Sequence, residues 1–382
     1  MITKARKAVF ICLFLALIFV PALLSLGGVH LGDGLNGAVV AVEKPALSVE
    51  AVMEGTWQES VEEWTKSELS VREPLIRLGN QFIFDVFNGT SNNNLVVGKD
   101  QSLFEDVYLE VQLQYSRVTE EYLASQLDKL EQLDRLLEAR GQQLVIFLTP
   151  MKSAFCEDSI PDVWKWAAPE QGASDYELFR DALASSSLTY YDSIPFVEAR
   201  RASGEQCWTK TGIHWTAVTG WLVAQDFSDF LEETFGYDFP EWEIASVPCE
   251  SPVYPDHDLF LNLNLLMKPY DEQYYEPVVT MREEGTNLPA VFSQGGSFQA
   301  QSILPLLRNA GVEGFAYVEN KEYTVYDGNE ETKTGFQAFG DVDMAQLLTD
   351  KDLVILEVNQ EAIDRMSFGF IDYLLDSGIL AQ

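Results

Sequence analysis

The chain has 382 residues, of which 47% are hydrophobic and 12% aromatic, enough for one α/β domain of about 250–300 residues with small additions. Its formal charge is −35. Three of its 25 basic residues (Lys4, Arg6 and Lys7) lie at the N-terminus, so the rest of the chain sets 22 basic side chains against 60 acidic ones. Such a surface repels phosphate backbones and anionic lipid headgroups, which argues against nucleic-acid binding. The acidity suits either contact with neutral glycans or solubility alone.

The N-terminal region predicts a membrane anchor. Residues 8–26 form 19 consecutive uncharged residues, which as a helix would span roughly 28 Å, about the thickness of a bilayer's hydrocarbon core. The basic residues before this run predict a cytoplasmic N-terminus. An uncleaved anchor is favoured over a signal peptide cleaved near the small residues 37–41.

The domain prediction follows from this anchor. Residues 1–27 are assigned to the transmembrane anchor, 28–54 to a linker and 55–382 to an extracytoplasmic domain. Within that domain, residues 55–117 are predicted to form an appendage packed on the main part.

The cysteine and histidine content restricts metal chemistry. Outside the anchor stand Cys156, Cys207 and Cys249, which in an oxidising compartment allow one disulfide and one thiol, with no pair identified by spacing. Only three histidines exist and no Cys-x-x-Cys motif is present, so neither a zinc site nor any other cofactor is predicted.

Helical and strand patterns alternate along the domain. Apolar spacing predicts two helices in 55–90, and turn signals predict a short hairpin over 95–104. Further helices are predicted at 118–140, 174–185, 216–235 and 298–310, and strands at 144–148, 188–191, 289–293, 314–318 and 353–357. Alternating strands and helices imply a mostly parallel sheet covered on both faces, with chemistry at the carboxyl ends of its strands.

Two polar residues stand just before predicted helices, Ser297 after a strand and turn and His214 after a loop. Ser297 follows Gly295-Gly296 on a strand–turn–helix, where glycines permit a sharp turn and free N–H groups can stabilise an oxyanion. A serine there is also a common helix cap. His214 stands just before the helix at 216–235 and is a candidate general base.

Five segments, in order, resemble the alginate O-acetyltransferase family typified by AlgX and AlgJ, whose fold is a circularly permuted SGNH hydrolase. They are Leu95–Asp100 with Leu103-Phe104, Leu148–Ser153, Tyr191-Asp192, Trp208–Trp215, and Gly295–Phe298. The segment Asp258–Asn264 also resembles part of that family, with no catalytic role assigned to it.

The resemblance implies a mechanism and partners. Ser297 would attack an acetyl donor, His214 would take its proton, and the acetyl-serine would pass its acyl group to a hydroxyl of an exported or cell-wall polysaccharide. A separate membrane-bound O-acyltransferase would supply the acetyl group. Lys152 and Trp215 are candidate cleft residues beside Gly295 and Gly296.

Two departures from the family pattern concern carboxylates. The family's orienting Asp stands at the position of Gly212, and the Asp next to its nucleophile stands at that of Gly296. Glu357, Asp192 or a backbone carbonyl are predicted to orient the imidazole instead. Two alternatives stay open: an acetyl-esterase of the same fold, and a non-catalytic glycan-binding scaffold subunit.

Overall fold

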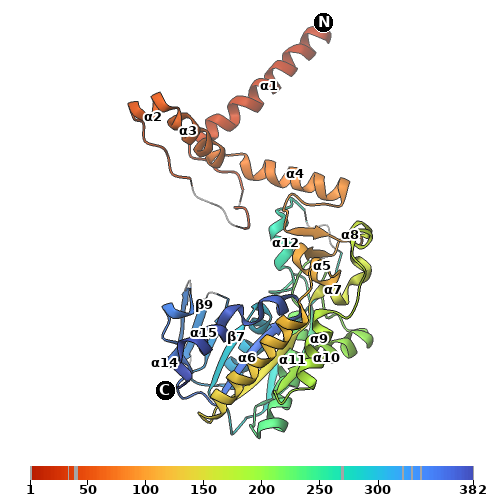
Figure 1. The fold of residues 1–382 in the computed structure, drawn as a ribbon. Coiled ribbons are helices and arrows are strands. Elements are labelled where there is room, and N and C mark those ends of the chain that lie inside the picture. Colours follow the sequence, from red (N-terminus) through yellow and green to blue (C-terminus); the bar gives the residue numbers. More distant parts are fainter. Residues whose placement is uncertain are drawn as a thin grey trace. The chain divides into compact units, whose positions relative to one another are not determined.

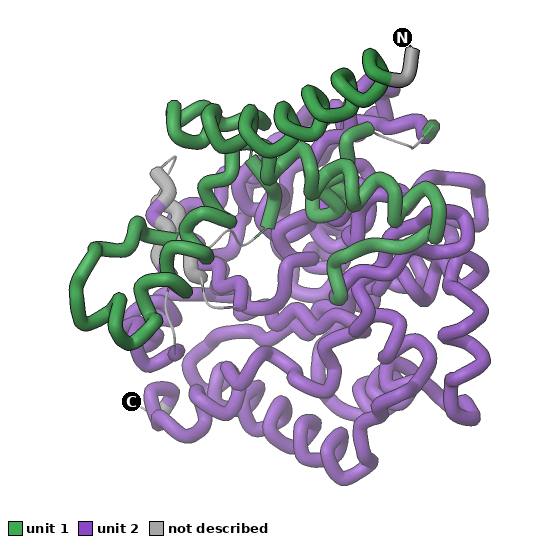
Figure 2. Tube along the Cα trace, turned by 90° about the horizontal axis from the view of Figure 1, so that it is seen from above, with its two compact units in different colours: residues 1–93, 260–271 green, residues 94–259, 272–382 purple. Residues whose placement is uncertain are grey.

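The computed structural model describes residues 2–32, 34–37, 42–267, 271–320, 322–327, 330–335 and 338–381. The chain forms two compact units, Met1–Asn93 with Phe260–Asp271, and Asn94–Leu259 with Glu272–Gln382, coloured separately in Figure 2. The predicted appendage over 55–117 is thus divided between the units, since residues 94–117 belong to the second.

The first unit contains the apolar N-terminal helix. Within α1 (Ile2–Leu26), Lys4–Leu26 is the one helix of the described residues that is long and apolar enough to cross a membrane. The hydroxyl of Ser70 donates to the carbonyl of Pro21 over 3.1 Å, and the Ser70 N–H donates to Ser25 Oγ over 2.9 Å, which ties the end of α1 to the loop before α4. The alternative peptidase site at residues 37–41 lies, except for Gly37, outside the described residues. The other helices of this unit are α2 (Val49–Glu54), α3 (Thr56–Glu68) and α4 (Arg72–Phe87).

The second unit is built on a seven-stranded sheet of order β10-β9-β8-β7-β11-β3-β4. The strands from β8 to β4 pair in parallel, and β9 and β10 pair antiparallel at one edge. The bounds are β3 (Gln143–Thr149), β4 (Tyr190–Asp192), β7 (Val291–Gly295), β8 (Ala316–Glu319), β9 (Glu322–Asp327), β10 (Glu330–Gly335) and β11 (Leu353–Asn359). The fold class predicted from the alternating pattern, a parallel α/β sheet flanked by helices, is confirmed.

Helices cover both faces of this sheet (Figure 1). Leu144, Ile146 and Leu148 of β3 pack into a core with leucines of α6, while Phe147 points to the other face and stacks on Tyr191 and, from α11, Phe227. This alternation follows from the two-residue period of a strand. The helices of the unit are α5 (Asp106–Gln112), α6 (Glu120–Glu138), α7 (Lys152–Phe155), α8 (Asp162–Ala167), α9 (Asp175–Ala184), α10 (Ser193–Ala202), α11 (Ala217–Phe235), α13 (Ile303–Ala310), α14 (Met344–Leu348) and α15 (Phe370–Ser377), with the 3₁₀ segments η1 (Glu157–Ser159), η2 (Ser297–Gln301), η3 (Phe339–Asp341), η4 (Gln360–Gly369) and η5 (Ile379–Ala381).

Two small antiparallel pairs complete the unit. The predicted hairpin is present as β1 (Leu95–Val97) and β2 (Leu103–Glu105), with Val96 opposite Phe104. A two-stranded ribbon of β5 (Glu241–Cys249) and β6 (Tyr274–Glu283) was not predicted. The short helix α12 (Asp258–Leu263) begins in this unit. All four cysteines are free thiols, so the allowed disulfide is not formed.

Candidate active site

The candidate nucleophile lies on the turn that connects β7 to η2. Because β7 ends at Gly295 and η2 begins at Ser297, this serine stands at the carboxyl edge of the sheet, next to the end of β11. Its Oγ lies 2.7 Å from Nε2 of His214. The ring of Phe298 packs against one side of the imidazole, with 4.8 Å between the ring centroids. The structure therefore brings the two candidate catalytic residues into hydrogen-bond contact.

The loop that carries His214 is anchored by buried polar groups. The hydroxyls of Thr209 and Thr211 both donate to the carbonyl of Asp256, over 2.5 and 2.7 Å. Lys152 is fully buried, and its ammonium donates to the carbonyls of Leu103, Lys210 and Gly212 over 2.8, 3.1 and 2.7 Å. These hydrogen bonds fix the backbone of the loop and thereby the position of the His214 imidazole.

Burial perturbs this lysine. Loss of solvent lowers the pKa of Lys152 from 10.5 to about 8, although nearby acidic groups act in the opposite direction. Lys152 was predicted as a cleft residue, but its contacts place it beneath the loop. Trp215, also predicted to line the cleft, is fully buried and packs edge-on against Phe298, with 5.3 Å between ring centroids. Both side chains support the site from the interior.

The carboxylate on the other ring nitrogen of His214 belongs to Asp258. Its Oδ2 lies 2.5 Å from Nδ1, while its Oδ1 accepts from the N–H groups of Ile213 and Leu259 over 2.9 and 2.8 Å. A carboxylate only accepts hydrogen bonds, so it favours the tautomer with the proton on Nδ1 and leaves Nε2 free to accept from Ser297. Ser297, His214 and Asp258 thus form one hydrogen-bonded chain.

Both side chains predicted to orient the imidazole lie elsewhere. Asp192 caps α10 by accepting from the Ile194 N–H over 3.1 Å, and it also accepts from the Tyr176 hydroxyl over 2.8 Å. Glu357 accepts from the hydroxyl of Thr149 and, over 2.6 Å, from the N–H of Gly296. The prediction placed Glu357 at the correct edge of the sheet, but its carboxylate faces the glycine turn rather than the ring.

The backbone at Gly212 has no space for a side chain. A Cβ at this position would lie 2.9 Å from the carbonyl oxygen of Pro255 and 3.1 Å from the carbonyl carbon and oxygen of Asp256. The segment that occupies this space is the one that delivers Asp258 to the ring. The packing that excludes a side chain at 212 therefore also places the carboxylate of Asp258 beside the ring.

Glu357 supports the nucleophile turn. A Cβ on Gly295 would lie 2.5 Å from Cβ and 2.6 Å from Oε2 of Glu357, so only glycine fits against this side chain. Burial raises the pKa of Glu357 from 4.5 to about 7, against the lowering effect of its bonds with Thr149 and Gly296. Because a carboxyl oxygen accepts hydrogen bonds in either protonation state, Glu357 can bind the N–H of Gly296 with or without its own proton.

A small cavity opens at the nucleophile. Its volume is about 190 Å³, and Ser297, Tyr108, Glu357, Asn359 and Arg365 are among the residues that line it. Among the described residues, no group of three or more His, Cys, Asp or Glu side chains is placed to hold a metal ion. A hydroxyl, an imidazole and a carboxylate in series are the elements of serine-dependent acyl chemistry. The fold and the site together define an α/β protein with a parallel sheet and a Ser–His–Asp arrangement at its carboxyl edge.

Family comparison agrees with this class. Residues 95–284 match the family model described as SGNH hydrolase-like domain, acetyltransferase AlgX. This segment therefore belongs to the AlgX-type SGNH hydrolase-like acetyltransferase domain family, and the predicted resemblance is confirmed. The match includes His214 and Asp258 and ends before Ser297. No curated protein sequence matches the chain.

Three solved structures illustrate the similarity of fold. The O-acetyltransferase domain of Pseudomonas putida AlgJ is 18% identical, with 74% of this chain and 99% of that one covered and a TM-score of 0.45. Bacillus cereus PatB1 with a sulfonyl adduct is 10% identical, with 71% and 97% covered and a TM-score of 0.45. Pseudomonas aeruginosa AlgX is 14% identical, with 73% and 67% covered and a TM-score of 0.39. Since these TM-scores lie below 0.5, the assignment of roles depends on the geometry of this chain.

Proposed function

We propose that the protein is a serine-dependent O-acetyltransferase that acts on an exported or cell-wall polysaccharide. The observation that carries the proposal is the hydrogen-bonded series from Ser297 Oγ through His214 to Asp258. Ser297 attacks the acetyl carbonyl while His214 takes its proton at Nε2, and an acetyl ester forms on the serine as the donor leaves with the proton that His214 returns to it. His214 then takes the proton of a sugar hydroxyl, which attacks the ester, and gives this proton to Ser297 Oγ as the free serine is regenerated.

The turn supplies the electrophilic assistance that this reaction needs. The N–H of Ser297 is the first of η2 and has no partner within that short helix, so it is the donor assigned to the oxyanion. The neighbouring N–H of Gly296 is already bound by Glu357, which fixes the orientation of the peptide before the serine. Preorganised donors of this kind commonly contribute about 10²–10³ in rate.

The anchor indicates where the reaction occurs. Helix α1 is long and apolar enough to span a bilayer, and Lys4, Arg6 and Lys7 at its start favour a cytoplasmic N-terminus. The catalytic unit would then lie outside the cytoplasm, where the cytoplasmic acetyl donor acetyl-coenzyme A is absent. A membrane-bound O-acyltransferase partner is therefore the proposed acetyl donor.

The other two functions considered from the sequence differ in support. The scaffold alternative was considered because Gly212 cannot orient the imidazole. Asp258 contacts His214 Nδ1 and can serve as the orienting carboxylate, so this argument for a scaffold no longer holds. An acetyl-esterase would use the same three residues with water as the acceptor, so the acceptor must be tested directly.

The test uses the full chain in detergent with p-nitrophenyl acetate, with and without an oligosaccharide acceptor. We expect an acetyl group on Ser297 by mass spectrometry, and acetylated sugar when the acceptor is present. Ser297→Ala should abolish both. Ser302→Ala, which removes a buried hydroxyl bonded to the Phe298 carbonyl, serves as the matched control and should keep both. Release of acetate without acetylated sugar would identify an esterase, and an unmodified Ser297 with unchanged hydrolysis in Ser297→Ala would overturn the proposal.

A further inference from the structure

Three cavities of the second unit lie in series along one segment of the chain. The cavity at Ser297, of about 190 Å³, is lined by Asn359 and Glu361. The next, of about 290 Å³, is lined by Glu361 and Gln360, and the third, of about 840 Å³, again by Gln360. Asp175 and Val111 are also shared by the second and third cavities. Neighbouring cavities thus share lining residues, and the three together, starting at the nucleophile, are called the groove below.

The shared wall is held rigidly. Gln360 accepts from the Met151 N–H over 2.9 Å, which fixes its amide between β3 and β11. The side chain of Asn359 donates to the carbonyl of Pro150 over 2.8 Å and accepts from the Glu361 N–H over 3.0 Å. Glu361 is also paired with Arg365. The floor of the groove is therefore preformed, as is usual for ligand sites.

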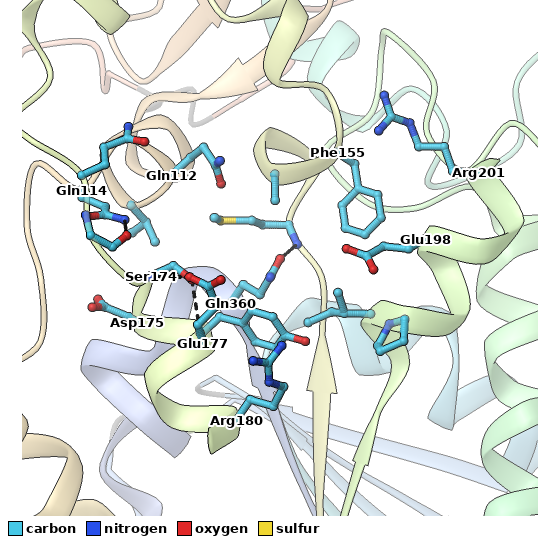
Figure 3. A pocket seen from close by; sticks show the side chains of 18 of the residues that line it. Gln112, Gln114, Phe155, Ser174, Asp175, Glu177, Arg180, Glu198, Arg201 and Gln360 are labelled. Carbon is cyan, nitrogen blue, oxygen red and sulfur yellow. Dashed lines mark hydrogen bonds between the residues drawn. The ribbon is translucent and has the colours of Figure 1, made fainter. Parts of the chain in front are cut away.

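The largest cavity has the chemistry of a site for hydroxyl-rich ligands. Figure 3 shows Gln112 and Gln114 on one side of this cavity, Glu198 and Arg201 on another, and Gln360 between them. Amides, carboxylates and guanidinium groups offer the donors and acceptors that sugar hydroxyls need, because each hydroxyl both donates and accepts. The rings of Phe155 and Tyr176 add apolar surface to the same wall.

The charge of the groove selects among glycans. Its lining contains seven acidic side chains (Glu105, Asp175, Glu177, Glu198, Glu357, Glu361 and Asp364) and four basic ones (Arg117, Arg180, Arg201 and Arg365). Two of these arginines are already paired with acids, Arg180 with Asp181 and Arg365 with Glu361. The protein as a whole carries −35. A polyuronate, with one carboxylate on each sugar, would meet net repulsion along this path.

We propose that the three cavities form one acceptor groove that takes an oligosaccharide without negative charge, with a hydroxyl at Ser297 and the following sugars in the 840 Å³ cavity. The inference rests on the proposed function and specifies its substrate class: an uncharged glycan, in contrast to the alginate named for the related family. A longer acceptor is bound better than a short one, because only the longer one reaches the large cavity.

The first experiment compares acceptors on the full chain in detergent. Acetyl transfer is measured to a neutral mannose hexasaccharide, to a mannose disaccharide and to a hexamer of mannuronate. At low salt we expect kcat/KM to be about tenfold or more higher for the neutral hexamer than for either of the others. Transfer to the mannuronate hexamer should rise with ionic strength, as screening weakens the repulsion. Equal use of the charged and neutral hexamers at low salt would overturn the inference.

The second experiment blocks the large cavity. Ala202, an exposed residue of α10, lines that cavity, whereas Ala199, exposed on the same helix, is not among its lining residues. Ala202→Trp should raise KM for the hexasaccharide about tenfold relative to KM for p-nitrophenyl acetate, while Ala199→Trp should change neither KM. Unaltered KM in Ala202→Trp would contradict the groove.

A binding measurement separates this inference from the proposed function. Calorimetry of the Ser297→Ala variant with the neutral hexasaccharide measures binding to the groove in the absence of acetyl transfer. Binding there that is lost in the double variant with Ala202→Trp supports the groove even if no acetyl transfer is found. Absence of acetylation would reject the proposed function, and absence of hexasaccharide binding would reject the groove.

Discussion

The carboxylate of Asp258 lies 2.5 Å from Nδ1 of His214, although 44 residues separate the two in sequence. The same carboxylate accepts from two backbone N–H groups, so its position is fixed independently of the ring. In serine-dependent catalysis this contact sets the imidazole tautomer and stabilises the imidazolium that forms when the serine is deprotonated.

Asp258→Asn should therefore lower kcat strongly with little change in fold. The amide can donate to Nδ1 and thereby favour the tautomer with the proton on Nε2, which cannot accept from Ser297. A loss of about 10⁴ in kcat for p-nitrophenyl acetate is expected. Nitrogen NMR of the histidine ring would show the tautomer directly. A loss of less than about tenfold, with the tautomer unchanged, would contradict the role given to Asp258.

A carboxylate placed at position 212 provides the control. Gly212→Asp combined with Asp258→Asn should not recover activity, because a Cβ at 212 would lie 2.9 Å from the Pro255 carbonyl oxygen. Gly212→Ala alone should lower the free energy of unfolding by about 1–3 kcal/mol, as measured by denaturant titration. Recovery in the double variant would mean that the segment 255–258 moves aside more easily than its contacts indicate.

Lys152 should affect catalysis through the histidine loop. Lys152→Met removes the three hydrogen bonds that hold the carbonyls of Leu103, Lys210 and Gly212, and a loosened loop should lower kcat by about tenfold or more. Lys129→Met, which breaks the surface pair with Asp372, is the matched control and should retain kcat. Full activity in Lys152→Met would show that the loop holds without its anchor.

The pH dependence of stability gives an independent readout of Lys152. Its pKa is lowered to about 8 in the folded protein, against 10.5 for an ordinary lysine. Between about pH 8 and 10.5 the unfolded chain binds more protons than the folded one at this site, so the contribution to the free energy of unfolding rises with pH. Lys152→Met should lack that rise.

The comparison of sequence and structure shows which features are local. The leucine stripe at 118–140 and the apolar run at 144–148 predicted α6 and β3 correctly, because each pattern reflects burial against neighbours of known type. Ser297 and His214 were selected because each precedes a helix and lies in a segment that resembles the family, and the structure places Ser297 Oγ 2.7 Å from His214 Nε2. Both signals depend on only a few adjacent residues.

The partner of His214 depended on tertiary structure. Asp258 is the first residue of a short helix that the sequence pattern did not predict. Its segment resembled part of the family, but nothing in it indicated that the carboxylate reaches the ring. Glu357 was favoured since it ends a strand at the catalytic edge, which is correct, but the direction of its side chain is decided by the glycine turn beside it. Contacts of this kind follow from register and packing rather than from periodicity.

Glu357 should make stability depend on pH. Its folded pKa is about 7, against 4.5 for an ordinary glutamate, so between these values the folded state holds a proton that the unfolded chain has released. The free energy of unfolding should therefore fall as pH rises through this window, by on the order of 3 kcal/mol. Glu357→Gln resembles the protonated form and should show a smaller fall in denaturant titrations between about pH 4.5 and 7.

Asp256 makes a second contribution of the same sign. It is buried, and burial raises its pKa from 3.8 to about 7. Asp256→Asn should remove this part, and the double variant with Glu357→Gln should remove both. A fall in stability of equal size in wild type and in Glu357→Gln would show that Glu357 is ionised in the folded protein at neutral pH.

Gly295 and Gly296 should respond differently to a single methyl group. Gly295→Ala would place Cβ 2.5 Å from Cβ of Glu357 and 3.1 Å from its backbone oxygen, so the strand or the side chain must shift. We expect a decrease of about 1–3 kcal/mol in the free energy of unfolding. Gly296→Ala, whose Cβ would lie 3.4 Å from Glu357 Oε2, is the neighbouring control and should cost less than about 1 kcal/mol.

The double variant identifies the cause of that difference. Glu357→Gly removes both the carboxylate and the Cβ that crowd Gly295, so in this background Gly295→Ala should cost less than it does in the wild type. The coupling free energy from the thermodynamic cycle should be about 0.5–3 kcal/mol in favour of the double variant, as for residues in direct contact. Additive costs would place the conflict with the backbone of β11 instead, because the carbonyl oxygen of residue 357 remains 3.1 Å from the new methyl group in both backgrounds.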